Sequence, residues 1–180
     1  YNGTPDATIE NYEIVGKVGD DAVGITGIIA GFDNENAGEN KGVTLIYSEA
    51  SLTGSDSGNY ELKSEGHQAT ARATIFPKEV DNLVITIDDG LEYTGSKIIP
   101  VITVKESEDN GAPVIAAEEY TVTYKQGETV INAENLIHSG TYTVYITDAK
   151  NDTGNTGNYT LGDANKDFVI SAAVLYTPYP

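Results

Sequence analysis

Residues 142–147 read Tyr-Thr-Val-Tyr-Ile-Thr, and the earlier residues 120–125 read Tyr-Thr-Val-Thr-Tyr-Lys. In the later stretch, Tyr142, Val144 and Ile146 alternate with Thr and Tyr neighbours. Successive side chains of a β-strand point to opposite faces of a sheet, so this period of two predicts strands with one buried and one wet face. Gly, Thr and 12 Tyr are frequent elsewhere, and no long run of strong helix formers occurs. The sequence therefore predicts an all-β protein.

Three landmarks recur in the same order in both halves of the chain. Matching landmarks lie roughly 95 residues apart, which is close to the size of one immunoglobulin-like sandwich. We therefore expect two tandem immunoglobulin-like β-sandwich modules, residues 1–78 and residues 79–175, followed by an extended joint at residues 176–180. The matching landmarks are residues 1–4 (YNGT) and 93–96 (YTGS), residues 58–62 (GNYEL) and 157–161 (GNYTL), and the apolar stretches 73–76 and 168–170.

Further strands are expected between clusters of Gly, Asn and Asp, which suit tight turns. Helix is expected only as a turn within residues 112–119, where Pro113 limits its length. Residues 78–82 are expected to form a short polar joint that restricts the movement of the modules. The first module opens directly at Tyr1, so it either lacks a first strand or has that strand in preceding chain. The further strand candidates are residues 12–18, 22–29, 42–47, 69–76, 83–87 and 101–105.

The charge balance of 10 basic and 28 acidic residues, a net charge of −18, argues against some partners. Nucleic acid and anionic membranes would add like-charge repulsion, so neither is expected as a partner. No stretch approaches the roughly 20 apolar residues that span a bilayer, so no membrane insertion is expected. Cys is absent, which excludes disulfides, thiolate metal sites and a thiol nucleophile. A strongly charged, soluble monomer located outside the cell or on its surface is expected.

Five stretches of the first module resemble a known family. Together they are similar to the YDG repeat of bacterial surface proteins, although Asn2 stands where the name-giving Asp would be and an acidic insertion occupies residues 10–13. The second module resembles MBG-type and bacterial Ig-like repeats at residues 93–95, 120–124, 140–144 and 157–159. The stretches in the first module are residues 1–4, 19–21, 36–41, 52–62 and 73–78.

These resemblances imply a role. Such repeats stand in tandem in large secreted or surface-anchored, adhesin-like proteins, where they are thought to act as stalk or spacer modules. The neighbouring modules of the same longer chain would then be the partners of this one. The resemblance alone does not assign a chemistry, because one fold supports many functions.

Two tyrosines are candidates for a structural site. Tyr60 follows Asp56 to Asn59, and Tyr159 stands at the matching place in the second module. This context is typical of the tyrosine corner of immunoglobulin sandwiches, in which the hydroxyl returns to nearby backbone. A plain core or surface tyrosine is the alternative at both positions.

The sequence contains few residues arranged for calcium binding or catalysis. Several loops are rich in the oxygen ligands that calcium prefers, at residues 33–36, at Asp148 with Asn151 and Asp152, and at residues 163–167. Their spacing is not that of a complete calcium loop, so no metal site and no cofactor are predicted. Only His67 and His138 are available as imidazoles, and no HExxH or GxSxG arrangement occurs.

Two functions therefore compete. The chain is expected to be a non-catalytic spacer module. The alternative is a binding module for glycan or host protein, because sandwich loops and exposed Tyr rings can form such sites.

Overall fold

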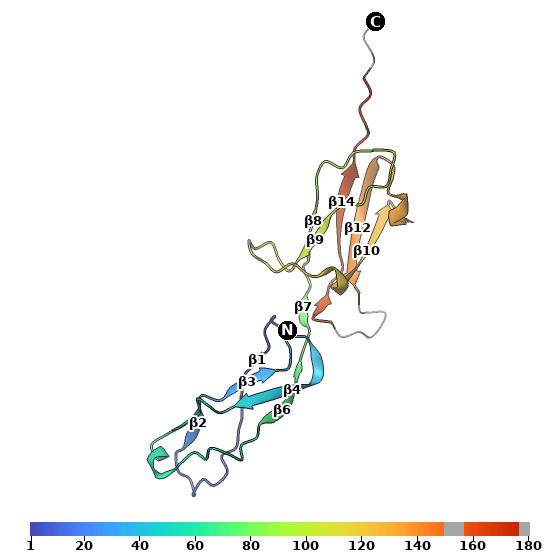
Figure 1. Ribbon diagram of the computed structural model, residues 1–180. Coiled ribbons are helices and arrows are strands. Elements are labelled where there is room, and N and C mark those ends of the chain that lie inside the picture. The colour runs from blue at the N-terminus through green and yellow to red at the C-terminus, as the bar shows by residue number, and fades with distance from the viewer. Residues whose placement is uncertain (150–156, 177–180) are drawn as a thin grey trace. The chain divides into compact units, whose positions relative to one another are not determined.

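The computed structural model describes residues 1–149 and 157–176, and these residues form strands, turns and a few single-turn 3-10 helices. The all-β prediction is thereby confirmed. The chain divides into two compact units, Tyr1–Pro77 (unit 1) and Lys78–Pro180 (unit 2). The division falls between Pro77 and Lys78 because Lys78 already belongs to a strand of unit 2. Figure 1 shows how the strands of each unit are arranged.

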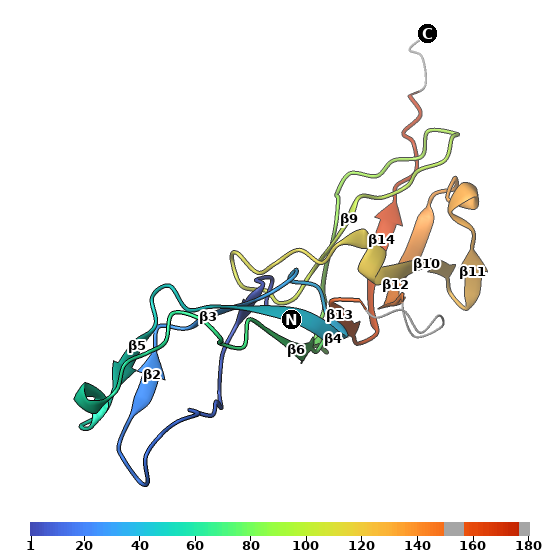
Figure 2. The same ribbon diagram turned by 60° about the horizontal axis from the view of Figure 1, so that its bottom comes forward.

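Unit 1 is built on a four-stranded antiparallel sheet in the order β1-β3-β4-β6, with a separate antiparallel ribbon of β2 and β5. Figure 2 shows β3, β4 and β6 of this sheet from a second direction. Among the apolar residues of unit 1 only Ala30 and Val43 are buried, at 8% and 6% exposure, so its core is small. The elements are β1 (Asp6–Ala7), β2 (Gly24–Thr26), β3 (Ile29–Phe32), β4 (Gly38–Ile46), β5 (Ser51–Thr53), the 3-10 helix η1 (Ser57–Asn59) and β6 (Thr70–Ile75).

Unit 2 contains a four-stranded antiparallel sheet in the order β11-β10-β12-β14, an antiparallel pair of β8 and β9, and a parallel pair of β7 and β13. Its first elements are β7 (Lys78–Val80), β8 (Val84–Ile87), β9 (Ile102–Lys105), the 3-10 helix η2 (Ala117–Glu119) and β10 (Tyr120–Gln126). The remaining elements are β11 (Thr129–Ile131), the 3-10 helix η3 (Ala133–Asn135), β12 (Gly140–Asp148), β13 (Tyr159–Leu161) and β14 (Ala164–Ile170).

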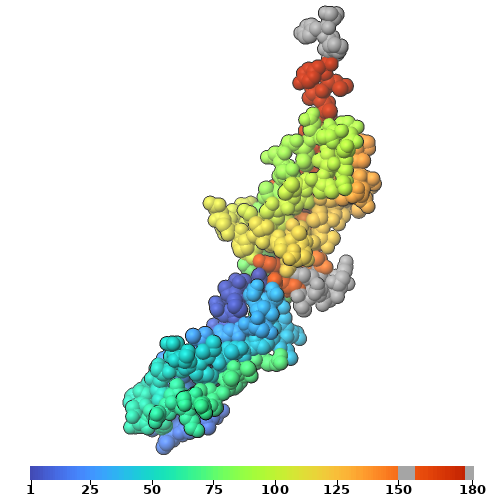
Figure 3. Space-filling view, viewed as in Figure 1, coloured from blue at the N-terminus to red at the C-terminus, as the bar shows by residue number. Residues whose placement is uncertain are grey.

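The core of unit 2 lies between its sheet and the β8–β9 pair. Tyr142, Val144 and Ile146 of β12 are buried, at 2%, 0% and 0% exposure, as their alternation predicts. They join one cluster with Ile85 of β8 and Val104 of β9. The space-filling view shows the segment that carries β8 and β9, in green, in front of the orange strands of the sheet (Figure 3). This two-layer packing is that of a β-sandwich-type fold.

The two units share a plan. In each, a central strand of nine residues, β4 or β12, pairs with the last strand of the sheet, β6 or β14. The backbone N of Tyr1 donates to the carbonyl of Phe76, directly after β6, and the N of Tyr93 donates to the carbonyl of Ser171, directly after β14. The opening landmark of both units also forms the same turn, with φ of 77° at Gly3 and 75° at Gly95.

The strand predicted at residues 12–18 is wrong. These residues form no strand, and Val15 and Val18 are 91% and 67% exposed. Gly16, at a φ of 92°, interrupts the extended backbone, and Tyr12 uses its hydroxyl to bind the backbone of Ile25 instead of packing in a sheet. The predicted turn of helix is confirmed as η2. The other candidates, at residues 22–29, 42–47, 69–76, 83–87 and 101–105, each contain or overlap a strand.

The predicted joint at residues 78–82 is largely a strand. Lys78–Val80 form β7 and pair in parallel with Tyr159–Leu161 of β13, so this segment is part of unit 2. At the other end, residues 172–176 form no strand, and Leu175 and Tyr176 are 93% and 88% exposed. The rest of the predicted extended joint, residues 177–180, lies outside the described residues.

Candidate functional site

Two loops of unit 1, one before β2 and one after β5, are held together by side chains. The hydroxyl of Tyr60 donates to Oδ2 of Asp21 at 2.6 Å and accepts from the backbone N of Val18 at 3.0 Å. Beside it, Oδ2 of Asp56 accepts from the backbone N of Ala22 at 2.8 Å. These bonds link positions that are 34 to 42 residues apart. They fix the two loops to each other at the end of the β2–β5 ribbon.

The two predicted corner tyrosines stand in different local structures. The hydroxyl of Tyr60 bonds to backbone, but at Val18, which is 42 residues upstream, whereas a corner hydroxyl returns only a few residues. Tyr159 begins β13 and packs, partly buried, against the core of unit 2. Tyr60 therefore joins distant loops, and Tyr159 contributes to a strand. A tyrosine corner at Tyr159 stays a prediction.

Tyr60→Phe is expected to lower the melting temperature of unit 1 by a few degrees at neutral pH, because Val18 and Asp21 lose their shared partner. The hydrogen bond donated to Asp21 raises the pKa of Tyr60 above its ordinary value of 10.0. The folded state thus keeps a proton that the unfolded state releases first. Its contribution is fully present below about pH 10 and is lost as pH rises through the raised pKa.

Thermal melts of wild type and Tyr60→Phe between about pH 7 and about pH 11 measure this effect. The difference in melting temperature should shrink at the alkaline end. Tyr47→Phe is the control, since the Tyr47 hydroxyl donates to the backbone carbonyl of Gln68 rather than to a carboxylate. A difference for Tyr60→Phe that stays constant over the whole range would contradict the assigned bond to Asp21.

The oxygen-rich loop at residues 33–36 uses its side chains internally. Oδ1 of Asp33 accepts from the backbone N of Asn34 at 3.0 Å, and Oδ1 of Asn34 accepts from the N of Asn36 at 3.1 Å. The ammonium of Lys41 lies 3.3 Å from Oδ1 of Asp33 and also donates to Asn34. A protein cation therefore supplies the positive charge that a metal would otherwise bring to this loop.

In the other two oxygen-rich segments, the carboxylates of Asp148 and Asp167 bond within the protein. Asp148 is 8% exposed, and its Oδ2 accepts from the backbone N of Leu161 at 2.8 Å. Its predicted companions Asn151 and Asp152 lie outside the described residues. Asp167 is part of the extended strand β14, and its Oδ1 accepts from Thr143 at 2.6 Å.

Calcium is expected to leave the stability of the protein unchanged. Within residues 1–149 and 157–176, no group of three or more Asp, Glu or His side chains is placed to hold a metal ion. A ligand that binds only the native state raises its melting temperature, so melting in chelator and in millimolar calcium tests this. Equal melting temperatures are the expected result. A rise of several degrees with calcium would show a site that this arrangement does not provide.

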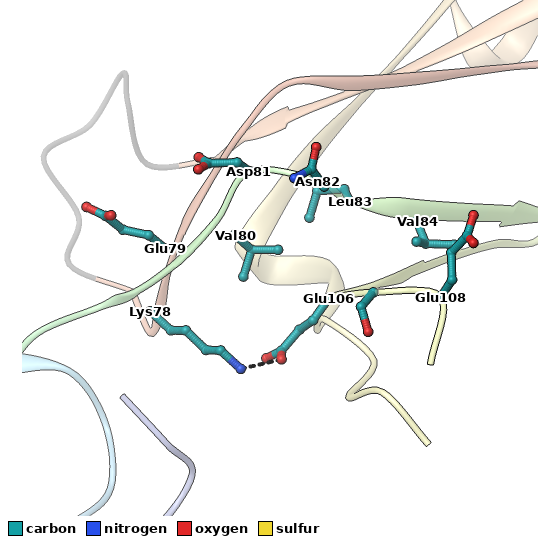
Figure 4. Close-up of a pocket in the computed structure, with 10 residues that line it drawn as sticks. Lys78, Glu79, Val80, Asp81, Asn82, Leu83, Val84, Glu106 and Glu108 are labelled. Carbon is teal, nitrogen blue, oxygen red and sulfur yellow. Dashed lines mark hydrogen bonds and ion pairs between the residues drawn. The ribbon is translucent and has the colours of Figure 1, made fainter. Parts of the chain in front are cut away.

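A hollow in unit 2 has a volume of about 620 Å³ and is lined by residues 78–84 and 106–108. Lys78 reaches toward Glu106 and forms an ion pair with it, as Figure 4 shows. Glu79 and Asp81 point to the other side of β7 in the same view. Glu79 and Asp81 therefore face away from the Lys78–Glu106 pair, because successive residues of an extended chain face opposite ways.

The two histidines have structural contacts. The ring of His67 stacks on Tyr47 with centroids 4.5 Å apart, and its Nε2 lies 2.6 Å from the carbonyl of Lys63. The backbone carbonyl of His138 accepts from the hydroxyl of Tyr142 at 2.9 Å. The His67 imidazole is therefore held by an aromatic ring and a backbone carbonyl. No described helix is long and apolar enough to cross a membrane.

Comparison with known proteins identifies one region. Residues 1–71 match the family model of the YDG domain. This confirms the resemblance drawn from the first module, and the match covers nearly all of unit 1. No curated protein and no solved structure matches the chain.

Proposed function

We propose that this chain is a pair of tandem immunoglobulin-like modules that act as a non-catalytic stalk or spacer in a bacterial surface or secreted, adhesin-like protein. The observation that carries the proposal is the plan shared by the two units. Each has a nine-residue central strand, a last strand beside it, and an opening tyrosine whose backbone N bonds just after that last strand. The YDG match supports the proposal for unit 1.

The connection between the units fits a spacer. Only Phe76 and Pro77 separate β6 of unit 1 from β7 of unit 2. Proline fixes its own φ, and a connection of two residues permits far less movement than a flexible linker. A spacer that holds another part of the protein at a distance needs such a short connection. The net charge of −18 suits an exposed location outside the cell, where it keeps the surface solvated.

A replacement experiment in the longer surface protein tests the spacer role. Deleting both units should reduce attachment of cells that display the protein, because its remaining binding part loses reach. Replacing them with two unrelated β-sandwich domains of similar length should restore attachment, since a spacer contributes length rather than recognition. Surface display is measured with an antibody as the control. A replacement variant that is displayed normally but attaches as poorly as the deletion would overturn the spacer proposal.

The second candidate is a binding module for glycan or host protein. Exposed tyrosine rings give it little support, because only Tyr12, Tyr93 and Tyr176 are exposed among the described tyrosines. The hydroxyl of Tyr12 is already used by the backbone of Ile25. A hollow on the sheet of unit 1 supports this candidate more directly.

A further inference from the structure

The sheet of unit 1 presents two ordered rows of side chains on one face. Strand register sets Gly42 of β4 opposite Arg72 of β6, and the backbone N of Asp33 bonds to the carbonyl of Gly42 from the other side. Two residues along β4, Thr44 pairs with Thr70 of β6 and with a glycine of β3. Directly paired residues and alternate residues share a face. Asp33, Gly42, Arg72, Thr44 and Thr70 therefore lie on the same face.

These side chains enclose a hollow with a glycine floor. The hollow has a volume of about 320 Å³ and is lined by Asp33, Gly42, Thr44, Thr70 and Arg72, together with Val43 and Ala71. Nothing in the fold requires glycine at position 42, because its φ is not positive and an added Cβ would only come 3.7 Å from Oδ2 of Asp33. Glycine inside a strand weakens it, and such a position often marks the close approach of a ligand.

The charges around the hollow are unusual for this chain. Arg72 is the only arginine in a chain with 28 acidic residues, yet no described carboxylate forms an ion pair with it. Its Nη1 donates at 2.7 Å to the backbone carbonyl of Asn40, which holds the side chain in place. Across the floor, the carboxylate of Asp33 is paired with Lys41. The hollow therefore combines a fixed, unpaired guanidinium with a neutralised carboxylate.

We propose that this hollow binds a sugar ring that carries a carboxylate, such as a uronic acid unit of an acidic glycan. The guanidinium of Arg72 matches a carboxylate through two parallel hydrogen bonds. The hydroxyls of Thr44 and Thr70 and the carboxylate of Asp33 bind ring hydroxyls, and the bare backbone at Gly42 lets the ring lie flat. This site adds recognition to unit 1 and does not depend on the spacer role.

The size of the hollow favours a small ring over a protein surface. Ligand hollows measure roughly 300 to 1,000 Å³, whereas a stable protein interface buries about 800 Å² on each partner. A single ring makes one ion pair and a few hydroxyl contacts, so a dissociation constant on the order of 1 mM is expected.

An NMR titration of the whole chain with sodium glucuronate tests the proposal. The amide signals of Gly42, Thr44, Thr70 and Arg72 should shift together and saturate. Glucose at the same concentrations should give a weaker effect, because it lacks the carboxylate. Sodium acetate should also give a weaker effect, because it lacks the ring hydroxyls. Equal shifts with acetate would show a simple anion site and would overturn the assignment to a sugar. Equal shifts with glucose would show that the carboxylate is not recognised and would overturn the role of Arg72.

Two variants locate the binding. Arg72→Gln should weaken glucuronate binding at least tenfold, which is the effect of losing one good charged contact. Gly42→Val fills the hollow with two methyl groups and should abolish binding. Lys97→Gln, which removes a cation that pairs with Glu134 in unit 2, is the matched control and should bind like wild type. The Arg72 side chain is exposed, so its removal tests the site even if Gly42→Val fails to fold. Unchanged glucuronate binding by Arg72→Gln would overturn the proposal.

Discussion

Val144→Asp is expected to unfold unit 2. Val144 is 0% exposed in the middle of β12, where the register sets it between Tyr124 of β10 and Lys166 of β14. A carboxylate at this position would lose most of its hydration in the core cluster, and the ammonium of the neighbouring Lys166 already donates to the carbonyl of Ile85. The expected cost is on the order of 4 kcal/mol or more. Small domains are stable by only about 5 to 15 kcal/mol, so most of the stability of unit 2 would be lost. Urea unfolding followed by the amide NMR signals of β10 and β12 measures the effect.

The control for this substitution is Thr121→Asp. Thr121 pairs with Thr147 of β12, is exposed, and lies on the opposite face of the same sheet. A charge there stays hydrated, so the free energy of unfolding should change by no more than about 0.5 kcal/mol. If Val144→Asp unfolded at the same urea concentration as Thr121→Asp, the assignment of the inner face of the sheet would be wrong.

The main strands of unit 2 could be predicted from the sequence for a physical reason. Residues 120–125 and 142–147 were predicted as strands, and they form most of β10 and β12. One side of these strands faces a large core, so burial imposes a strict alternation of apolar side chains. The alternation in the sequence and the burial in the structure therefore have the same cause. The prediction of an all-β fold rests on this agreement.

Where no large core imposes this alternation, as in unit 1, fewer strands could be predicted from the sequence. Unit 1 buries few apolar side chains, so an apparent strand at residues 12–18 could not be distinguished from an extended loop. β4 extends back to Gly38 through residues with no apolar alternation, and the prediction began only at Gly42. β7 has three residues and pairs with β13, far along the chain. Pairing over such separations leaves no local signal.

The candidate sites, too, could be predicted from the sequence only in part. Tyr60 could be singled out from its Gly-Asn-Tyr context, but its partners Asp21 and Val18 could not, because they belong to a loop about 40 residues away. The hollow around Gly42 and Arg72 depends on the register of β4 and β6, which the sequence does not contain. The composition indicates only the position of Arg72, because it is the single arginine in a strongly acidic chain.

Gly54→Ala is expected to unfold unit 1 or to separate β2 from β5. Gly54 directly follows β5 and has a φ of 101°, a conformation that residues with a side chain rarely adopt. A Cβ added there would lie 2.1 Å from the carbonyl oxygen of Ala22 and 2.8 Å from its carbon. Both atoms belong to the backbone, so the clash can be relieved only by moving the ribbon. We expect a loss of about 3 kcal/mol or more.

Gly66→Ala separates the two causes of this loss. Gly66 also has a positive φ, 85°, but an added Cβ would meet no atom within 4 Å. It should therefore lose only the conformational contribution, about 1 to 2 kcal/mol. The excess for Gly54→Ala measures the clash with Ala22, and a unit with only two buried apolar residues has little stability to offset it. Urea unfolding followed by the amide signals of β3 and β4 gives both values. Equal losses in the two variants would show that the backbone at Ala22 yields freely, and that the ribbon is not held closely at this point.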